Sequence, residues 1–466
     1  MLIPSANLMP PANFNYKSAY ARLMALLGMD RAIAASTATQ LVRFVTGPIT
    51  MMLMIKHLRP VEQGYFYSFA GVIGIQVFLE AGFAQSITQF SSKEFAWLRF
   101  NGNGVLVGKR DSLSRLRSLF QKANLYYSIM GGALMLTLMG GGYLFFSSKP
   151  DHGVAWLTPW LVGSACAAIG FTLTPFWALL EGCNRITEVA SYRFWASIVG
   201  FATTSICLLL GLGIDVVIWS SVVSVAFPVA YLALKWRKLA IQILRPPGKS
   251  QVSWRREIWG FQWRIAGTWM SRYFLESGLA PLAMQLHGPV VSGQIGMTFQ
   301  MIRMIGGIAN TWTAVRIPSW GALAAKGMWT EVNAAWSLAA RRSVGFCVLG
   351  MSAFVIALLV FQWLLPGPAA RFLPASSAAG FAIGWVLYSI WLVSMHYTRA
   401  LRREPYTFLH LGVGISFLAA SVLLSSKMGD ATIPWIFAAV HIPAAAIAWR
   451  ILHHIRTTTP QQSLNS

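Results

Sequence analysis

The 466-residue sequence is poor in charged residues, and acidic residues are especially scarce. Only 11% of its residues are charged, whereas a soluble domain carries about 25%. Its 14 Asp and Glu residues stand against 37 Lys and Arg residues, and 56% of the chain is hydrophobic. The hydrophobic residues form runs that are long enough to cross a bilayer. This composition excludes an ordinary soluble domain and indicates a multi-pass membrane protein.

Motifs for catalysis and metal binding are also missing from the sequence. The cysteines Cys166, Cys183, Cys207 and Cys347 lie in or beside apolar runs without metal-ligand spacing. Residues 102–110 resemble a phosphate-binding loop, but Arg110 replaces the Ser or Thr that would hold magnesium. No zinc-protease or Gly-x-Ser-x-Gly motif occurs. We therefore predict a protein that is not an enzyme and that uses no cofactor and no metal.

The apolar runs predict an all-α polytopic protein, because a closed barrel would need short alternating strands instead. Of the 37 Lys and Arg residues, 29 fall in segments on one predicted side, which the positive-inside rule assigns to the cytoplasm with both termini. The five outside are Lys56, Arg59, Lys149, Arg371 and Lys427. The predicted spans are 31–55, 64–88, 124–146, 155–180, 192–212, 215–234, 259–284, 291–316, 343–365, 375–398, 406–426 and 431–450.

The segments between the spans suggest how the chain is divided. Leu113, Leu116 and Phe120 recur at helical spacing beside basic residues, which we interpret as a helix lying on the inner leaflet. The Pro- and Gly-containing stretch 245–250 interrupts regular structure and predicts a linker between two halves. The predicted division is a cytoplasmic segment 1–30, a six-helix bundle 31–244, a cytoplasmic linker 245–258, a second six-helix bundle 259–452 and a cytoplasmic tail 453–466.

A weak internal repeat supports two related halves. Pro60-Val61-x-x-Gly64 matches Pro289-Val290-x-x-Gly293 at a shift of 229 residues. The same shift places Arg43 on Arg272, so each half has an arginine midway along its first span. Duplicated halves are a recurrent transporter architecture.

Polar residues inside the spans are the candidate functional residues. An arginine at mid-membrane costs about 2.5–3.5 kcal/mol or more, and so must face water, a counter-charge or a ligand. We predict substrate binding by Arg43, Arg272, Arg303, Gln40 and Gln300, with Glu80 and Glu276 as counter-charges or coupling sites. The alternatives are that Arg272 and Glu276 neutralise each other one turn apart, and that Glu80 pairs with Arg43. His396, His410 and His441 are interpreted as packing or interfacial residues.

The connector Leu58-Arg59-Pro60-Val61-Glu62-Gln63-Gly64-Tyr65 resembles that of the polysaccharide-repeat flippases (O-antigen or exopolysaccharide, Wzx-type). These belong to the multidrug/oligosaccharidyl-lipid/polysaccharide (MOP) exporter superfamily. Family members typically have Leu-x-Pro-x-x-x-Gly-Tyr after the first span and a Gly-rich turn after the second, here Glu80-Ala81-Gly82-Phe83. Pro318-Ser319-Trp320-Gly321 follows the eighth span. Glu276 departs from the family, where aspartate is frequent in that region.

The resemblance implies a V-shaped transporter made of two pseudo-symmetric six-helix bundles in the bacterial cytoplasmic (inner) membrane. Its implied function is to move undecaprenyl-diphosphate-linked oligosaccharide from the cytoplasmic to the periplasmic leaflet for O-antigen, capsule or exopolysaccharide biosynthesis. The implied partners are that lipid-linked substrate, membrane lipids, and the polysaccharide polymerase with its chain-length machinery. The residues agree, because planar guanidinium groups match diphosphate oxygens in bidentate geometry.

Other functions compete with this interpretation. A multidrug antiporter of the same superfamily would often take cationic substrates, which an arginine-rich cavity disfavours. An integral-membrane polysaccharide polymerase or ligase would need catalytic groups on its outer face, where the predicted connectors are short. The net charge of +23 does not indicate nucleic acid, because the basic residues follow the sides of the membrane.

Overall fold

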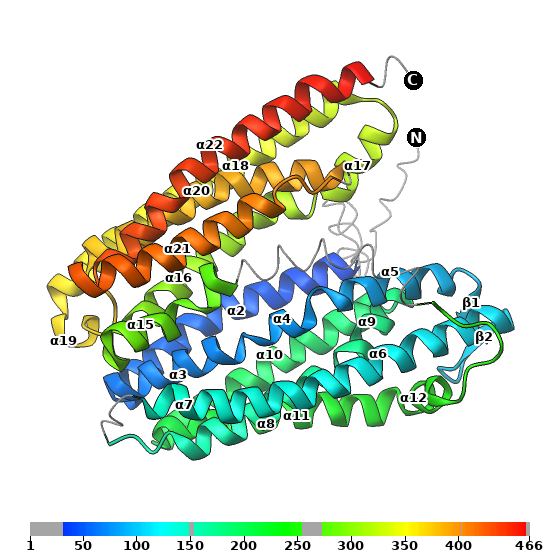
Figure 1. The fold of residues 1–466 in the computed structure, drawn as a ribbon, viewed down its shortest axis with the longest axis horizontal. Helices are drawn as coiled ribbons and strands as arrows, with labels where there is room; N and C mark the ends of the chain where they lie inside the picture. The colour runs from blue at the N-terminus through cyan, green and yellow to red at the C-terminus, as the bar shows by residue number, and fades with distance from the viewer. Residues whose placement is uncertain (1–30, 149–152, 254–272, 402, 463–466) are drawn as a thin grey trace, which may run out of the picture.

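The computed structural model describes residues 31–148, 153–253, 273–401 and 403–462, and its helices form two lobes (Figure 1). The first lobe contains α2 (Arg31–His57), α3 (Pro60–Ile73), α4 (Gln76–Glu80), α5 (Phe83–Phe95), β1 (Leu98–Phe100), β2 (Leu106–Gly108), α6 (Arg110–Leu136), η1 (Thr137–Gly141), α7 (Gly142–Ser147), α8 (Leu157–Thr172), α9 (Thr174–Gly182), α10 (Ile186–Leu209), η2 (Gly213–Asp215), α11 (Val216–Lys235) and α12 (Arg237–Leu244). The second contains η3 (Tyr273–Ser277), α15 (Leu279–His287), α16 (Pro289–Ala314), α17 (Ile317–Ala325), α18 (Trp329–Leu364), α19 (Pro366–Ala369), α20 (Ala375–Ala400), α21 (Thr407–Met428) and α22 (Thr432–Gln462).

The lobes form a V. They meet where α3 and α15 lie side by side and diverge toward the end where α2 begins and α22 ends (Figure 1). We term these two ends the closed end and the open end. The predicted fold, an all-α membrane protein with two helical bundles in a V, is confirmed.

Membrane-spanning character is unevenly distributed among the described helices. Eight of them are long and apolar enough to cross a bilayer, and a ninth span is formed if α3 to α5, bent by 46°, count as one. The long helices α2 and α16 are not among them, because polar residues interrupt both. Most of the predicted span 259–284 lies outside the described residues.

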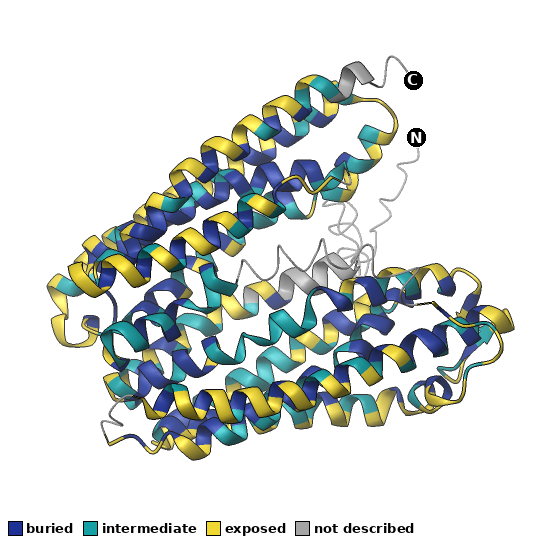
Figure 2. Cartoon of the chain, in the orientation of Figure 1, coloured by how far each residue is buried: buried dark blue, intermediate teal, exposed yellow. Residues whose placement is uncertain are grey.

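Lipid contact explains the outer surface. Exposed positions follow the outer faces of both lobes (Figure 2), and many carry large apolar side chains, including Leu144, Leu349 and Trp363. In water such a surface would be unfavourable, but in a bilayer it faces a solvent of the same polarity.

The lobes meet through glycines of the two repeat motifs. α3 and α16 both begin with the motif proline, whose fixed φ suits the first helical position. A Cβ added to Gly64 would lie 1.8 Å from the Pro289 carbonyl oxygen, and one added to Gly293 would lie 3.0 Å from Gly64 N. The two motifs therefore contact each other, as expected for an axis of pseudo-two-fold symmetry between α3 and α16.

Further contacts extend this glycine seam, which we define by Gly64, Gly293 and their neighbours on α3 and α16. A Cβ on Gly296 would lie 2.3 Å from Tyr67 Cγ, and these two residues are also related by the 229-residue shift. The hydroxyl oxygens of Ser68 and Ser292 are 2.7 Å apart and buried.

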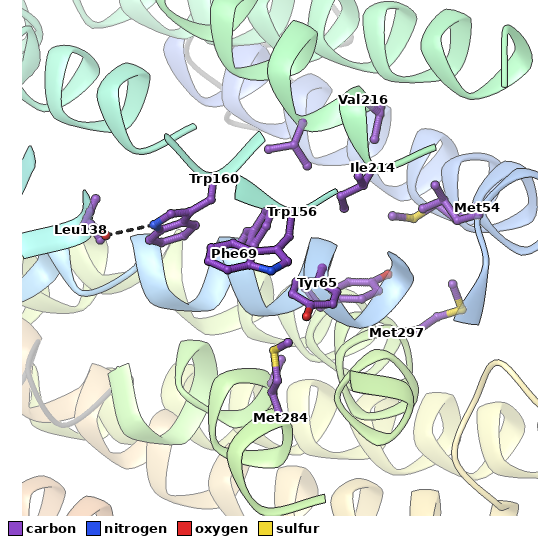
Figure 3. Packing of buried hydrophobic residues seen from close by; sticks show 14 of the residues in the cluster. Met54, Tyr65, Phe69, Leu138, Trp156, Trp160, Ile214, Val216, Met284 and Met297 are labelled. Carbon is purple, nitrogen blue, oxygen red and sulfur yellow. Dashed lines mark hydrogen bonds between the residues drawn. The ribbon is translucent and has the colours of Figure 1, made fainter. Parts of the chain in front are cut away.

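An aromatic cluster supports the seam from the first lobe. Tyr65 and Phe69 on α3 lie near Trp156 and Trp160 (Figure 3). The indole Nε1 of Trp160 donates to the Leu138 carbonyl at 3.0 Å. Met284 from the second lobe lies in the same cluster. Apolar packing is therefore continuous across the closed end.

At the open end the helices are longer than the sequence predicted. α6 begins at Arg110 and α18 at Trp329, where spans were expected from 124 and 343. The expected helix on the membrane surface is wrong, because Leu116 and Phe120 are buried inside the first lobe as part of α6. Their partners are Leu179 and Trp236 of the same core and the short antiparallel hairpin β1–β2, which was not predicted.

Substituting leucine at Gly64 tests the seam. The added side chain meets backbone atoms, so α3 and α16 must separate, and overpacking of this kind costs about 1–3 kcal/mol. We expect oxidative crosslinking of a Ser68→Cys/Ser292→Cys pair to fall severalfold when Gly64→Leu is added. Gly132→Leu on α6 is the matched control, since a Cβ there meets nothing within 4 Å. Equal crosslinking in both variants would contradict the proposed seam.

Candidate functional site

A cavity of about 640 Å³ lies between the lobes, beside the glycine seam. Its walls come from α2, α3 and α10 of the first lobe and from η3, α15 and α16 of the second. Five of the seven predicted site residues line it: Gln40, Arg43, Glu276, Gln300 and Arg303. Residues that were distant in sequence and chosen for their position within spans are thus brought to one chamber.

Arg43 and Arg303 reach the cavity from opposite lobes. Arg43 lies near the middle of α2, is exposed, and its Nε donates to Ser197 Oγ on α10 at 3.4 Å. Arg303 lies near the middle of α16, with its side chain 49% exposed. Both exposed guanidinium groups can therefore meet water or a ligand in the cavity.

Glu276 provides negative charge beside Arg303. Its Oε2 is 3.9 Å from Arg303 Nε, which is an ion pair longer than a hydrogen bond, and the Glu276 side chain is 14% exposed. Glu276 lies in the π-helical turn η3, whose wide geometry is frequent at functional sites. Among the described lining residues, the charged groups are thus two arginines and one glutamate.

Two predicted residues are not placed in the cavity wall. Glu80, at the end of α4, is not a lining residue, and α4 packs against α6 through a hydrogen bond from the Tyr126 hydroxyl to the Leu79 carbonyl, 2.7 Å long. No ion pair joins Glu80 to Arg43, both of which are described, so that alternative is wrong. Arg272 lies outside the described residues, and so do its expected equivalence to Arg43 and the alternative that it pairs with Glu276.

Sequence reasoning missed the contribution of α10. Ser197, Gly200, Phe201 and Thr204 line the cavity. Their spacing of three, four and seven residues places them on one helical face, and the small or polar residues Ser197, Gly200 and Thr204 in that face were the available signal. Phe66 and Tyr67 on α3 were missed as well.

A network of hydrogen bonds joins the lobes at the closed end, and Arg371 is at its centre. Arg371 precedes α20 in the second lobe, and its Nη2 donates to the carbonyls of Leu58 and Ile55 in the first. Gln63 Nε2 donates back to the carbonyls of Gly293 at 2.9 Å and Arg371 at 3.1 Å. Arg371, one of the five basic residues predicted outside, therefore joins the two lobes at the closed end.

Arg371 keeps its charge in this partly buried position. Burial lowers its pKa, whereas the nearby Glu62 carboxylate raises it. Because an arginine pKa starts above about 12, the guanidinium stays protonated and retains its donors at every physiological pH.

The three histidines noted in the sequence are buried in the second lobe. His396 Nδ1 lies 2.8 Å from Thr313 Oγ1, and His441 Nδ1 donates to the Phe437 carbonyl at 2.7 Å. His410 Nε2 lies 3.4 Å from Met395 Sδ. None of the three lines the cavity. Among the described residues, no group of three or more His, Cys, Asp or Glu could hold a metal ion.

The arrangement of the two lobes is similar to that in several solved transporter structures. A multidrug resistance MATE family transporter of the MOP superfamily, in an inward-facing conformation, has a TM-score of 0.60 at 13% identity, covering 93% of this chain and 99% of that chain. The lipid II flippase MurJ, in an inward closed conformation, has a TM-score of 0.64 at 11% identity, covering 90% and 87%. An outward-facing MATE family transporter has a TM-score of 0.55 at 15% identity, covering 92% and 95%.

These similarities establish the fold over nearly the whole chain. No family model and no curated protein matches the sequence. The protein therefore has the two-lobed fold of the MOP-superfamily transporters, and the cavity lies between the lobes of that fold.

Removing the Arg371 side chain tests the closure. Arg371→Gln leaves the carbonyls of Leu58 and Ile55 without this donor, and an unpaired buried group costs about 1–3 kcal/mol. We expect a cysteine introduced as Ser292→Cys to react several times faster in this variant than in the protein with Arg371, when a membrane-impermeant maleimide is added on the side of the closed end. Arg59→Gln is the control, since Arg59 contacts Glu62 and Gly153 within its own lobe. Unchanged labelling with Arg371→Gln would show that its hydrogen bonds do not hold the lobes together.

Proposed function

We propose that the protein is a lipid-linked oligosaccharide flippase that moves undecaprenyl-diphosphate-linked repeat units from the cytoplasmic to the periplasmic leaflet. The observation that carries the proposal is that Arg43 and Arg303 face one cavity from opposite lobes. A diphosphate has oxygens to accept from both guanidinium groups at once, and charge-assisted bidentate bonds of this kind are strong and directional.

The substrate divides naturally between this cavity and the bilayer. Gln40 and Gln300 lie on the same faces as the arginines, and with Ser197 and Thr204 they offer donors and acceptors suited to sugar hydroxyls. The polyprenyl tail would remain in lipid while the headgroup crosses. The substrate would be used in O-antigen, capsule or exopolysaccharide biosynthesis, with the polymerase and chain-length machinery acting next.

The open end is assigned to the cytoplasm. Both long basic segments, 91–123 and 235–257, fall on the predicted inside, and the hairpin β1–β2 and α12 within them lie at the open end (Figure 1). Substrate would enter there, and separation of the glycine seam and of the Arg371 network would release it outside.

The membrane potential favours this direction. Moving two negative charges outward across 100 mV, inside negative, yields about 4–5 kcal/mol. Glu276 is the described carboxylate next to Arg303, so a diphosphate that approaches Arg303 would change the electrostatic environment of Glu276. Glu80 lies apart from the cavity and is proposed only as a coupling site.

A multidrug antiporter is the second candidate, favoured by the presence of Glu276 in the cavity and by the MATE likeness. A cationic drug would bind the Glu276 carboxylate in competition with Arg303. Polymerisation or ligation would require a reactive group on the outer face.

Alanine variants of the two arginines test the headgroup role. Each guanidinium–phosphate contact is worth about 1.5–3 kcal/mol, so we expect Arg43→Ala and Arg303→Ala each to lower flipping at least about tenfold. The assay follows labelled undecaprenyl-diphosphate oligosaccharide in proteoliposomes. Arg341→Ala is the control, because Arg341 is an exposed arginine on α18 outside the cavity. Wild-type flipping in both variants would reject the proposal, and efflux of cationic dyes in its place would support the antiporter.

Lysine variants separate charge from shape. Lysine keeps the positive charge but lacks the planar fork. We expect Arg303→Lys to flip substrate no more than about twofold better than Arg303→Ala, because bidentate contact is lost in both. Near-wild-type flipping by Arg303→Lys would mean that the cavity recognises charge alone. Equal amounts of inserted protein, measured by immunoblot, make the variants comparable.

A further inference from the structure

A second cavity, of about 760 Å³, lies in the second lobe at the open end. α17 forms one wall with Ile317, Ala322 and Ala325, and the end of α20 and the start of α18 form the others. Arg399 and Arg403 lie in the wall as well. The chamber is separate from the interlobe cavity, with which it shares no lining residue.

The corresponding place in the first lobe is filled. α5 follows the second span of its half and packs on α9, the end of the fourth span, as α17 packs on α20. Thr88 Oγ1 on α5 donates to the Ala178 carbonyl on α9 at 3.1 Å, and a Cβ on Gly182 would lie 2.5 Å from Ser91 Cβ. The hollow under α17 is therefore a difference between two halves of similar design and does not follow from the fold itself.

The lining combines an apolar wall with two cationic groups. The carboxylate of Glu404 accepts from Arg399 Nε at 2.8 Å, which orients the guanidinium but engages only one of its five N–H donors. The α17 wall is built from alanine, glycine, proline and aliphatic residues, and Trp329 completes the lining. Tryptophan is enriched at the membrane–water boundary, so this composition matches the region where a lipid headgroup meets its acyl chains.

We propose that this cavity, termed the α17 cavity, holds one anionic phospholipid of the inner leaflet. Its phosphate lies against Arg399 and Arg403, and the first carbons of its acyl chains lie along α17. The charge complementarity is direct, because the inner leaflet is negatively charged and attracts basic residues placed near its surface. The volume is that of a small-molecule site. The proposal uses the orientation assigned above but does not depend on the transported substrate.

Native mass spectrometry of the delipidated full-length protein tests this proposal. Phosphatidylglycerol and phosphatidylcholine with identical acyl chains are titrated separately, and the dissociation constant of the first bound lipid is measured. For the wild type we expect phosphatidylglycerol to bind at least about tenfold more tightly. The two lipids share the same phosphate, but the choline ammonium of phosphatidylcholine brings a positive charge close to Arg399 and Arg403, and a repulsion of about 1.4 kcal/mol is enough for that factor. Equal binding of the two lipids would overturn the proposal.

Paired variants localise the effect. Arg399→Gln/Arg403→Gln should reduce the preference for phosphatidylglycerol to within about twofold, because the two positive charges that distinguish the headgroups are removed. Arg341→Gln/Arg342→Gln removes the same charge from exposed positions on α18 outside the cavity and should keep the preference. Ala322→Phe keeps both arginines but fills the cavity, and should weaken binding of both lipids. If Arg399→Gln/Arg403→Gln does not fold, the Ala322→Phe variant provides the test. Lipid binding like that of the wild type, in either folded variant, would overturn the proposal.

Competition distinguishes the source of the phosphate. Inorganic phosphate in millimolar excess should leave phosphatidylglycerol bound, and displacement would mean that the site takes a soluble anion, contrary to the proposal. Undecaprenyl phosphate binding there in preference to phosphatidylglycerol would make the cavity an entry station for substrate and would also overturn it. Because no transport is measured, failure here leaves the proposed flippase activity untouched.

Discussion

A guanidinium group in the hydrocarbon layer must have water, a counter-charge or a ligand, and this requirement organises the molecule. Leaving one in lipid costs about 2.5–3.5 kcal/mol or more, and Arg43 and Arg303 both lie near the middle of long helices. The cavity between the lobes meets the requirement for both. It also explains why α2 and α16, the least lipid-compatible of the long described helices, face the interior while apolar helices surround them.

The closed end meets the opposite demand, since the lobes must touch firmly and still be able to part. Glycines at 64 and 293 allow the backbones of α3 and α16 to touch, which maximises dispersion contacts over a short seam. The polar bonds across it come from a few side chains, chiefly Gln63, Ser68 and Arg371. Their hydrogen bonds end on neutral carbonyl, hydroxyl or thioether groups, so separating the lobes breaks no hydrogen bond to a carboxylate. A seam of this kind can open as a unit, which alternating access would require.

Much of this arrangement was readable in the sequence, and the failures have physical reasons. The polar stripes of α2 and α16 predicted the cavity because a helix keeps its phase along its length. Glu80 does not line the cavity, because the chain breaks near Gly74 between α3 and α4 and the helical phase is not carried across that break. Leu116 and Phe120 have the same spacing whether their apolar face meets lipid or protein, so periodicity alone could not decide. Arg371 was counted only as an outside charge because its partners are backbone carbonyls, which leave no trace in a sequence.

The charge of the cavity bears most directly on the class of substrate. Its described lining contains Arg43, Arg303 and Glu276, and the Arg303–Glu276 separation of 3.9 Å is too long for a hydrogen bond. An anion can therefore approach both arginines without first breaking a tight ion pair. It would be attracted by one arginine from each lobe. A cation would meet two like charges and would have to draw Glu276 away from Arg303. In a low-dielectric chamber those like-charge terms are large, and this balance of charges is the reason for proposing a phosphate-bearing lipid as the substrate rather than a cationic drug.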